Sequence, residues 1–386
     1  MGRCILHFGM QKTGSSSIQD TLFYGLDDPR YRYFSAGEIN GSRMLYTLTA
    51  GDSLANFYWG RSTDGVSFVK QRKEYYHRKL RRAMDRVRSD GGTLVLSGED
   101  GWGQQEEGMK RLRGVFEDDG FETTLMVYVR PWKSFLESNY LQRLNIMTKR
   151  IVSTSQVREI ELRDSNRLNY REKLEMFDRV FGRESVIAKK FATESFPNGC
   201  VVQDFVSTFG IPIEVSKIRR TNESLSMEAS KLLYAYRMFG PVERGWGGLK
   251  FWRHYWMVLS LQEIEGERLK FHSQMISPIL ERQLPQADWL EERIGASFRE
   301  DLYKDDDREC IRQLSDFYRF KESTLNWLSN RVGGRMPSAL EGEDAARQVA
   351  VLMDRLRHQL PSVSKAAGSI RRFSERCWRR WRSGDF

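Results

Sequence analysis

Gly9-Met-Gln-Lys-Thr-Gly-Ser-Ser-Ser17 joins two segments of different pattern near the start of the chain. The segment before it, Cys4–Phe8, is a short and mostly apolar run, as expected for a buried strand. The segment after it, Ser17–Phe23, carries Ile18 and Leu22 on what would be one face of a helix. A strand, a glycine-containing loop and a helix in this order predict the first unit of an α/β fold.

Three more candidate strands lie further along the chain, at Thr93–Ser97, Thr123–Val129 and Ser185–Phe191. The run Thr123–Val129 is continuously apolar or β-branched, which is typical of a strand covered on both faces. Pro131 follows it at a suitable first helical position, and a helical pattern covers Trp132–Leu144. Strands that alternate with helices predict a mostly parallel central sheet flanked by helices.

The rest of the chain is largely helical in pattern. The predicted helices are Tyr75–Arg88, Val201–Phe209, Ser226–Phe239, Arg253–Glu267 and Ala287–Glu292. The best candidate boundary is Val332–Ser338, which contains two glycines and a proline. We therefore predict a main domain of residues 1–330 and a basic, helical C-terminal extension of residues 331–386.

Composition excludes several classes of protein. The chain has 386 residues, 40% hydrophobic and 30% charged, so it is not a disordered protein. Its four cysteines are far apart, so neither a disulfide scaffold nor a cysteine-rich zinc site is expected. No apolar stretch reaches the roughly 20 residues of a membrane span. These features predict a cytoplasmic protein.

The net charge of +10 is unevenly distributed along the sequence. Half of the excess lies between Lys365 and Phe386, and the remainder of the chain is only mildly basic, so no nucleic-acid partner is expected. Phe373, Trp378 and Trp381 stand among the arginines of this tail. Such a mixture suits peripheral contact with the inner, anionic membrane surface, although a solvated terminal helix is the plainer interpretation.

The loop after the first strand predicts an anion-binding site. Gly9 and Gly14 match the first half of a nucleotide-binding G-x-x-x-x-G-K-[ST] motif, but Ser15 and Ser16 stand where lysine and a magnesium-binding hydroxyl belong. The only cation, Lys12, lies inside the loop. Backbone N–H groups, hydroxyls and one lysine suit a phosphosulfate, whose transferred group carries a single negative charge, and need no metal. The alternative is an ordinary glycine-rich turn.

The segment His7–Gln19 resembles the 5′-phosphosulfate-binding loop of sulfotransferases that use 3′-phosphoadenosine 5′-phosphosulfate (PAPS), in particular their bacterial branch. The resemblance implies a P-loop-like sulfotransferase fold, with PAPS as donor, adenosine 3′,5′-bisphosphate as product and no metal. It implies that Lys12 stabilises charge on the leaving phosphate. The residues that it implies around that phosphate are Gln11, Lys12, Thr13, Gly14, Ser15, Ser16 and Ser17.

Two further segments resemble the same family. Arg130 follows a predicted strand and Ser138 comes eight residues later, as in the family's site for the 3′-phosphate of the donor. If a helix begins at Pro131, the Ser138 hydroxyl faces back toward Arg130. Arg219–Ser226 is similar to a late Arg-x-Asn-x-Ser segment and makes Arg220 a candidate nucleotide contact. Taken alone, these residues fit a surface ion pair, a solvated serine and a helix cap by Ser226 or Ser224.

Three residues are candidates for the general base that accepts the acceptor's proton. Glu99 follows the second predicted strand, where ligands bind in open α/β sheets, and related bacterial sequences carry Ser-Glu there. Glu38 follows the first helix, in a segment where family members that sulfate glycosaminoglycans often carry a catalytic glutamate. His7 lies on the first strand and has a packing role as its alternative, while Asp100 is a candidate partner for one of the cations.

Together these features predict a sulfotransferase that moves a sulfuryl group from PAPS to a hydroxyl or amine of a carbohydrate, glycolipid or other polar metabolite. A saccharide is the expected acceptor, but the segments that would form its pocket, Tyr31–Arg88 and the helices after Gly240, carry no motif. Two alternatives remain open. A P-loop nucleotide-dependent kinase would require Mg²⁺, and a non-catalytic basic binding protein would not depend on Lys12.

Overall fold

The computed structural model describes residues 2–10, 12–51, 65–145, 168–220, 225–241 and 249–359. They fall into two compact units, each made of three stretches of chain. The first unit comprises Met1–Pro131, Ser165–Asn222 and Pro285–Phe298. The second comprises Trp132–Asp164, Glu223–Leu284 and Arg299–Phe386.

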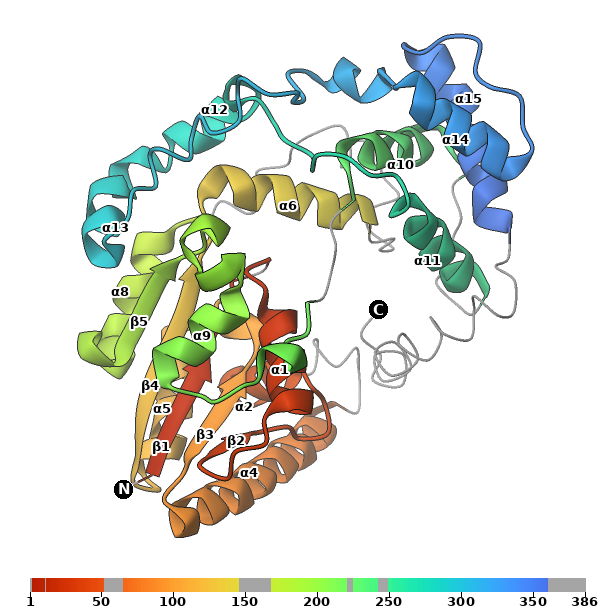
Figure 1. Cartoon of the computed structure of the whole chain (residues 1–386). Helices are drawn as coiled ribbons and strands as arrows, with labels where there is room; N and C mark the ends of the chain where they lie inside the picture. Colours follow the sequence, from red (N-terminus) through yellow and green to blue (C-terminus); the bar gives the residue numbers. More distant parts are fainter. Residues whose placement is uncertain are drawn as a thin grey trace. The chain divides into compact units, whose positions relative to one another are not determined.

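A parallel five-stranded sheet forms the centre of the first unit (Figure 1). Its strands are β1 (Gly2–His7), β2 (Tyr31–Tyr33), β3 (Thr93–Ser97), β4 (Phe121–Val129) and β5 (Val186–Lys190), in the order β2-β3-β1-β4-β5. Every neighbouring pair in this order is parallel. The four strands predicted from sequence are confirmed. Strand β2 was missed because three residues are too few to show a period.

Helices cover both faces of this sheet. The helices of the first unit are α1 (Ser15–Gly25), α2 (Ser42–Thr49), α4 (Gly65–Asp90), α5 (Glu106–Glu117), α8 (Tyr170–Phe181), α9 (Val201–Phe209) and α13 (Ala287–Ile294). Helices α1 and α9 pack on one face, where Ile5 and Met126 of the sheet meet Ile18 of α1 and Phe205 of α9. Helices α4, α5 and α8 contact the strands from the opposite side (Figure 1). The α/β fold with a flanked, parallel central sheet is therefore confirmed.

The second unit is helical. Its helices are α6 (Trp132–Asn145), α10 (Met227–Phe239), α11 (Leu249–Leu261), α12 (Ser273–Glu281), α14 (Glu322–Val332) and α15 (Glu343–His358). Helix α10 lies at its centre, because 11 of its 13 residues are buried. Of the two predicted caps, Ser226 is the one that caps this helix, with its Oγ accepting a hydrogen bond of 3.2 Å from the amide of Ala229. Helix α11 ends at Leu261 rather than at the predicted Glu267, because the chain turns after Leu261.

The predicted division between residues 1–330 and 331–386 does not coincide with the division into units. Helix α15 packs against α10 and α14 inside the second unit. It buries an apolar stripe that includes Val349, Met353 and Leu356, so it belongs to that unit's core rather than to an appendix. The basic tail Lys365–Phe386 lies outside the described residues.

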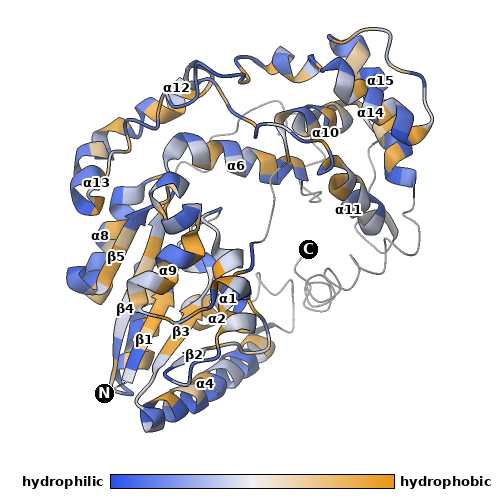
Figure 2. Cartoon of the chain, in the orientation of Figure 1, coloured by the Kyte–Doolittle hydropathy of each residue, from blue (hydrophilic) through white to orange (hydrophobic). Residues whose placement is uncertain are grey.

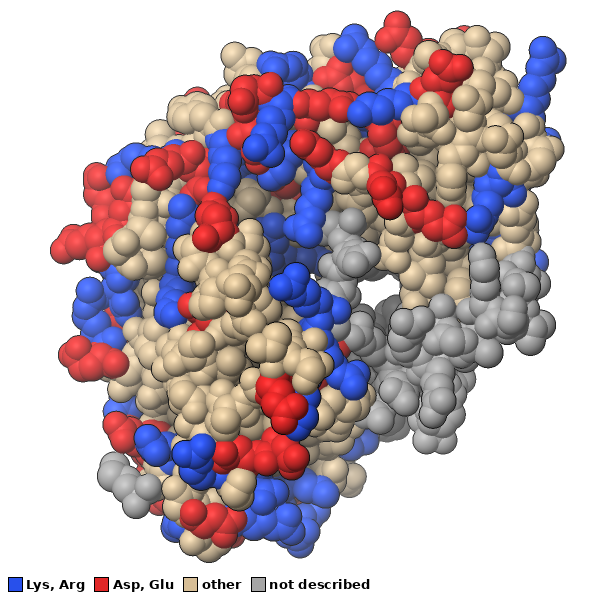
Figure 3. Space-filling view, in the orientation of Figure 1, with Lys and Arg blue, Asp and Glu red and all other residues tan. Residues whose placement is uncertain are grey.

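The surface carries both signs of charge. Figure 2 shows hydrophobic residues concentrated on the strands, whereas α4 is largely hydrophilic. Basic and acidic side chains are interspersed over the face shown in Figure 3, in agreement with the mild charge expected of the main part of the chain. Among the described residues, no helix combines the length and the apolar character that crossing a bilayer requires.

Candidate functional site

Three strands of the first unit end side by side at one edge of the sheet, and the candidate residues follow them. His7 of β1 lies opposite Ser97 of β3 and Met126 of β4 in the parallel register. The loop of residues 8–14 leaves β1 at this edge, Glu99 follows β3, and Arg130 follows β4. Ligands of open α/β sheets bind beyond the carboxyl ends of the strands, so this edge is the candidate site.

The loop between β1 and α1 has a tightly constrained backbone. Lys12 and Gly14 adopt left-handed conformations, with φ of 69° and 77°. For a lysine this conformation costs about 1–2 kcal/mol, so contacts around the loop must maintain it. The Thr13 hydroxyl donates a hydrogen bond of 2.6 Å to the carbonyl of Met10. Nη1 of Arg130 donates another to the carbonyl of Lys12. The residue that was predicted from the end of β4 thus braces the loop itself.

Helix α1 begins without a side-chain cap. Its N-cap residue is Gly14, which has no side chain to cap the helix, and its first turn contains no acidic residue. The first amides of an α-helix have no partner within the helix and carry a partial positive charge. Together with the left-handed residues of the loop, they form a concentration of hydrogen-bond donors that suits an anion.

A buried hydroxyl lies inside the loop. Ser15 is only 2% exposed, and among the described residues its Oγ has no hydrogen-bond partner. It faces Gly9, where a Cβ atom would stand only 1.8 Å from this Oγ. Gly9 is therefore required by space, not by its φ angle. A buried hydroxyl without a partner costs about 1–3 kcal/mol, and an anion bound in the loop would remove that cost.

His7 lies beneath the loop in the core of the unit. Its Nδ1 is 2.8 Å from Ser97 Oγ, which also accepts a hydrogen bond of 3.1 Å from Gln19. The ring of His7 packs edge-to-face on Phe205, with centroids 5.2 Å apart. Burial lowers the pKa of His7 to about 3, so the ring is neutral at physiological pH. His7 is fully buried, so its ring has no face exposed to a substrate in this structure, as its packing interpretation requires.

The two candidate carboxylates come from segments that meet at the end of β3. Glu99 is half-buried and opens a short 3₁₀ turn directly after the strand. The segment that carries Glu38 is tied to the same place, because the Gly41 amide donates to the Ser97 carbonyl at 2.8 Å. The amide of Asp100 also donates to Ser42 Oγ at 3.1 Å. The fold therefore brings both segments to one side of the loop.

Glu38 has a structural task at this place. Its Oε1 is 3.1 Å from Nη1 of Arg43 on α2, whose side chain is only 3% exposed, against 37% for Glu38. A buried guanidinium needs a counter-charge, and Glu38 supplies it. Sequence reasoning missed Arg43 because it lies in a segment that carries no recognisable motif.

Arg130 is held by an aromatic residue as well as by the loop. Its guanidinium lies over the ring of Phe191, 5.4 Å from the centroid. Phe191 follows β5, and its amide donates to the carbonyl of Val129 at the end of β4. Phe191 was not predicted to belong to the site. The only signal in the sequence was that it ends a predicted strand, as Arg130 follows another.

The remaining candidates are Ser138, Arg220, Gln11 and the serines at the start of α1. Ser138 is half-buried on α6 and belongs to the second unit, so its pairing with Arg130 stays a prediction. Arg220 is exposed, and the preceding Arg219 lies over the ring of Tyr24 at 4.2 Å from its centroid. Gln11 and residues 221–224 lie outside the described residues. Ser16 is half-exposed and Ser17 buried at the start of α1.

Comparison with known proteins adds little to this geometry. No family model and no curated protein matches the chain. Among solved structures, a sulfotransferase from Alicyclobacillus acidocaldarius is similar at 13% sequence identity with a TM-score of 0.39, over 76% of this chain and 98% of that one. A similarity this distant does not establish a family or an activity for the chain.

Proposed function

We propose that the chain is a sulfotransferase that uses PAPS as its donor. The observation that carries this proposal is the loop between β1 and α1, where the Ser15 hydroxyl is buried without a partner beside an uncapped helix start. A hydroxyl, the amides at the start of α1 and one lysine within the loop form a donor set for a phosphate of modest charge. The motif resemblance of His7–Gln19 to the phosphosulfate-binding loop points to the same ligand.

The residues of the loop fit the 5′-phosphosulfate by their chemistry. Gly9 leaves room for the Ser15 hydroxyl, and Gly14 lets the loop turn into α1 without a side chain over the first amides. Thr13 contributes through its backbone, because its hydroxyl is already bonded to Met10. Lys12 supplies the positive charge inside the loop.

When bound, the donor supplies a sulfuryl group, whose S–O bond to the phosphate breaks as a bond to the acceptor oxygen or nitrogen forms. Lys12 would stabilise the negative charge that develops on the leaving phosphate. Arg130, with Ser138 and Arg220, would hold the 3′-phosphate, since a guanidinium offers paired donors to phosphate oxygens. Glu99 would accept the proton of the acceptor. We favour it over Glu38 because it directly follows β3, at the strand end where ligands of open α/β sheets bind.

The acceptor is proposed to be a hydroxyl or amine of a carbohydrate, glycolipid or other polar metabolite, and the compartment the cytoplasm. Peripheral contact of the tail Lys365–Phe386 with an anionic membrane would suit a lipid-linked acceptor.

Isothermal titration of the full chain with adenosine 3′,5′-bisphosphate, and separately with ATP and Mg²⁺, tests the proposal. We expect micromolar binding of the bisphosphate without metal and much weaker binding of ATP. Arg130→Ala should weaken the bisphosphate about 10- to 100-fold, because it removes charged hydrogen bonds. Since Arg130 also braces the carbonyl of Lys12, unfolding by urea should be measured on the same variant.

Arg179→Ala is the matched control. Arg179 lies on α8 in the same unit, 56% exposed and paired with Glu106 at 3.0 Å, so the variant loses the same charge from the surface. We expect its affinity to stay within twofold of the wild type. Tighter binding of ATP with Mg²⁺ than of the bisphosphate would instead support a kinase, and equal loss in both variants would reduce the effect to general electrostatics.

A further inference from the structure

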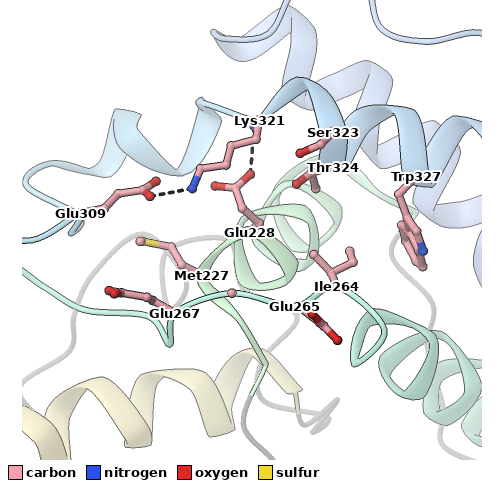
Figure 4. Close-up of a pocket in the computed structure, with 11 residues that line it drawn as sticks. Met227, Glu228, Ile264, Glu265, Glu267, Glu309, Lys321, Ser323, Thr324 and Trp327 are labelled. Atoms are coloured by element: carbon pink, nitrogen blue, oxygen red, sulfur yellow. Dashed lines mark hydrogen bonds and ion pairs between the residues drawn. The ribbon is translucent and has the colours of Figure 1, made fainter.

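The second unit contains a cavity of about 260 Å³ that has no part in the site described above. It lies between the start of α10, the segment after α11 and the start of α14 (Figure 4). Its lining combines four glutamates and one lysine with apolar, aromatic and hydroxyl-bearing side chains. Its volume is below the range of about 300–1,000 Å³ that is usual for drug-sized ligands, so its ligand is small.

Two of its carboxylates are neutralised by lysines. Glu228 Oε1 is 2.6 Å from Nζ of Lys231, and Glu228 Oε2 accepts a hydrogen bond of 2.9 Å from the amide of Lys321. The ammonium of Lys321 lies 2.7 Å from Glu309 and holds the pKa of that carboxyl below its usual value. Figure 4 shows Glu309 and Lys321 pointing toward each other at one end of the cavity. This end is therefore a preformed, charge-balanced wall.

The other two carboxylates give the cavity its net charge. Glu265 and Glu267 are exposed at the rim, and neither forms an ion pair within the described part of the chain. Glu267 lies toward Met227 and Glu309, whereas Glu265 lies on the side of Ile264 and Trp327 (Figure 4). The rim of the cavity thus carries two exposed carboxylates, and the apolar side chains of Met227 and Ile264 line the cavity beside them.

A buried hydroxyl also faces the cavity. Thr324 in the first turn of α14 is only 4% exposed, and its Oγ1 forms no hydrogen bond with the residues that the structure describes. It lines the cavity beside Ser323 (Figure 4). Trp327, one turn further along α14, adds an aromatic ring to the wall. The indole is the aromatic ring that attracts cations best, and a hydroxyl oxygen accepts a hydrogen bond from an ammonium group.

We propose that this cavity binds a short aliphatic diamine or polyamine. One ammonium group lies between Glu265 and Trp327, with Thr324 Oγ1 as a hydrogen-bond acceptor. The second ammonium group lies beside Glu267, and the methylene chain runs along Met227 and Ile264. Both ends of such a ligand are cationic and its middle is apolar, which is the pattern that the lining presents. The site is independent of the donor loop in the first unit.

Isothermal titration of the full chain with 1,5-diaminopentane tests the proposal, with 1,5-pentanediol as the uncharged ligand of the same length. We expect measurable binding of the diamine and none of the diol. The double variant Glu265→Gln/Glu267→Gln should weaken the diamine at least about tenfold, because it removes two charged acceptors. Thr324→Val should weaken it less, by about threefold, because it removes one neutral acceptor.

Glu281→Gln/Asp307→Asn is the matched control. Both residues are exposed in the second unit and do not line the cavity, and the variant loses the same two charges. It should bind the diamine within twofold of the wild type. Binding of the diol as tight as that of the diamine, no binding by the wild type, or equal loss in the control would each overturn the proposal. Lys12→Ala should bind the diamine as the wild type does, which separates this test from that of the sulfotransferase.

Discussion

The loop before α1 and the cavity before α14 both lie at the start of a helix whose N-cap side chain does not cap the first turn. They differ in the charges around that helix start. The first turn of α1 has no acidic residue, and Lys12 and Arg130 stand beside it. The first turn of α14 contains Glu322, and the cavity beside it is lined by four glutamates.

The difference shows that an uncapped helix start does not by itself select an anion. The partial positive charge of the first turn is worth about 0.3–1 kcal/mol at an exposed position, so a few full charges nearby outweigh it. Neighbouring side chains therefore decide the sign of the ligand. In the first unit the neighbouring lysine and arginine add to the partial positive charge of the helix start. In the second unit the neighbouring glutamates outweigh it.

The largest expected effect concerns the carboxylates beside the donor loop. Glu99→Gln should lower PAPS turnover about 10²–10⁴-fold in a screen of saccharide acceptors, because it removes the proposed proton acceptor. Glu38→Gln should instead lower the free energy of unfolding by about 1–3 kcal/mol, because it removes a carboxylate that pairs with the buried Arg43. Urea unfolding and turnover should be measured on both variants. Loss of turnover in Glu38→Gln with full turnover in Glu99→Gln would reverse the assignment.

The second comparison replaces one lysine by alanine in the donor loop and one beside the cavity. Lys12→Ala should lower turnover about 10²–10³-fold, because it removes the charge that stabilises the leaving phosphate. Alanine is strained at a φ of 69° as lysine is, so the variant changes the charge and not the backbone cost.

Lys321→Ala, beside the cavity, should instead strengthen ligand binding. It removes the nearer of the two lysines that pair with Glu309 and one positive charge from the cavity wall, so 1,5-diaminopentane should bind about threefold more tightly. Titration of both variants with both ligands checks the pair. Weaker diamine binding in Lys321→Ala would contradict the view that this region selects cations.

The smallest effect distinguishes two hydroxyls of the donor loop. Ser15→Ala should raise the free energy of unfolding by about 1 kcal/mol, because its Oγ is buried without a partner, and should weaken the bisphosphate. Thr13→Val should lower the free energy of unfolding by about 1 kcal/mol, because its hydroxyl bonds Met10. Both values come from urea unfolding without ligand. A destabilised Ser15→Ala would show that the hydroxyl serves the fold rather than a ligand.

Local sequence patterns predicted the elements that position the donor loop. The run Cys4–Phe8, the two glycines and the stripe from Ile18 to Leu22 each involve residues close together in the chain, and β1 and α1 follow them. The same holds for Arg130 at the end of β4 and for Ser226 as the cap of α10. Such patterns are readable because neighbours along the chain must satisfy the same helix or strand geometry.

Other features of the site arise only from tertiary packing and have no local sequence pattern. The sequence alone determined that a glycine-containing loop with an internal lysine follows the first strand. Only the tertiary structure brought Arg130 to the carbonyl of a residue 118 positions earlier, and set Glu38 against a buried Arg43. It also closed a cavity between α10 and α14. These contacts depend on which faces of separate elements meet, and that choice is made by the whole core, whereas a strand or a helix depends on its own few residues.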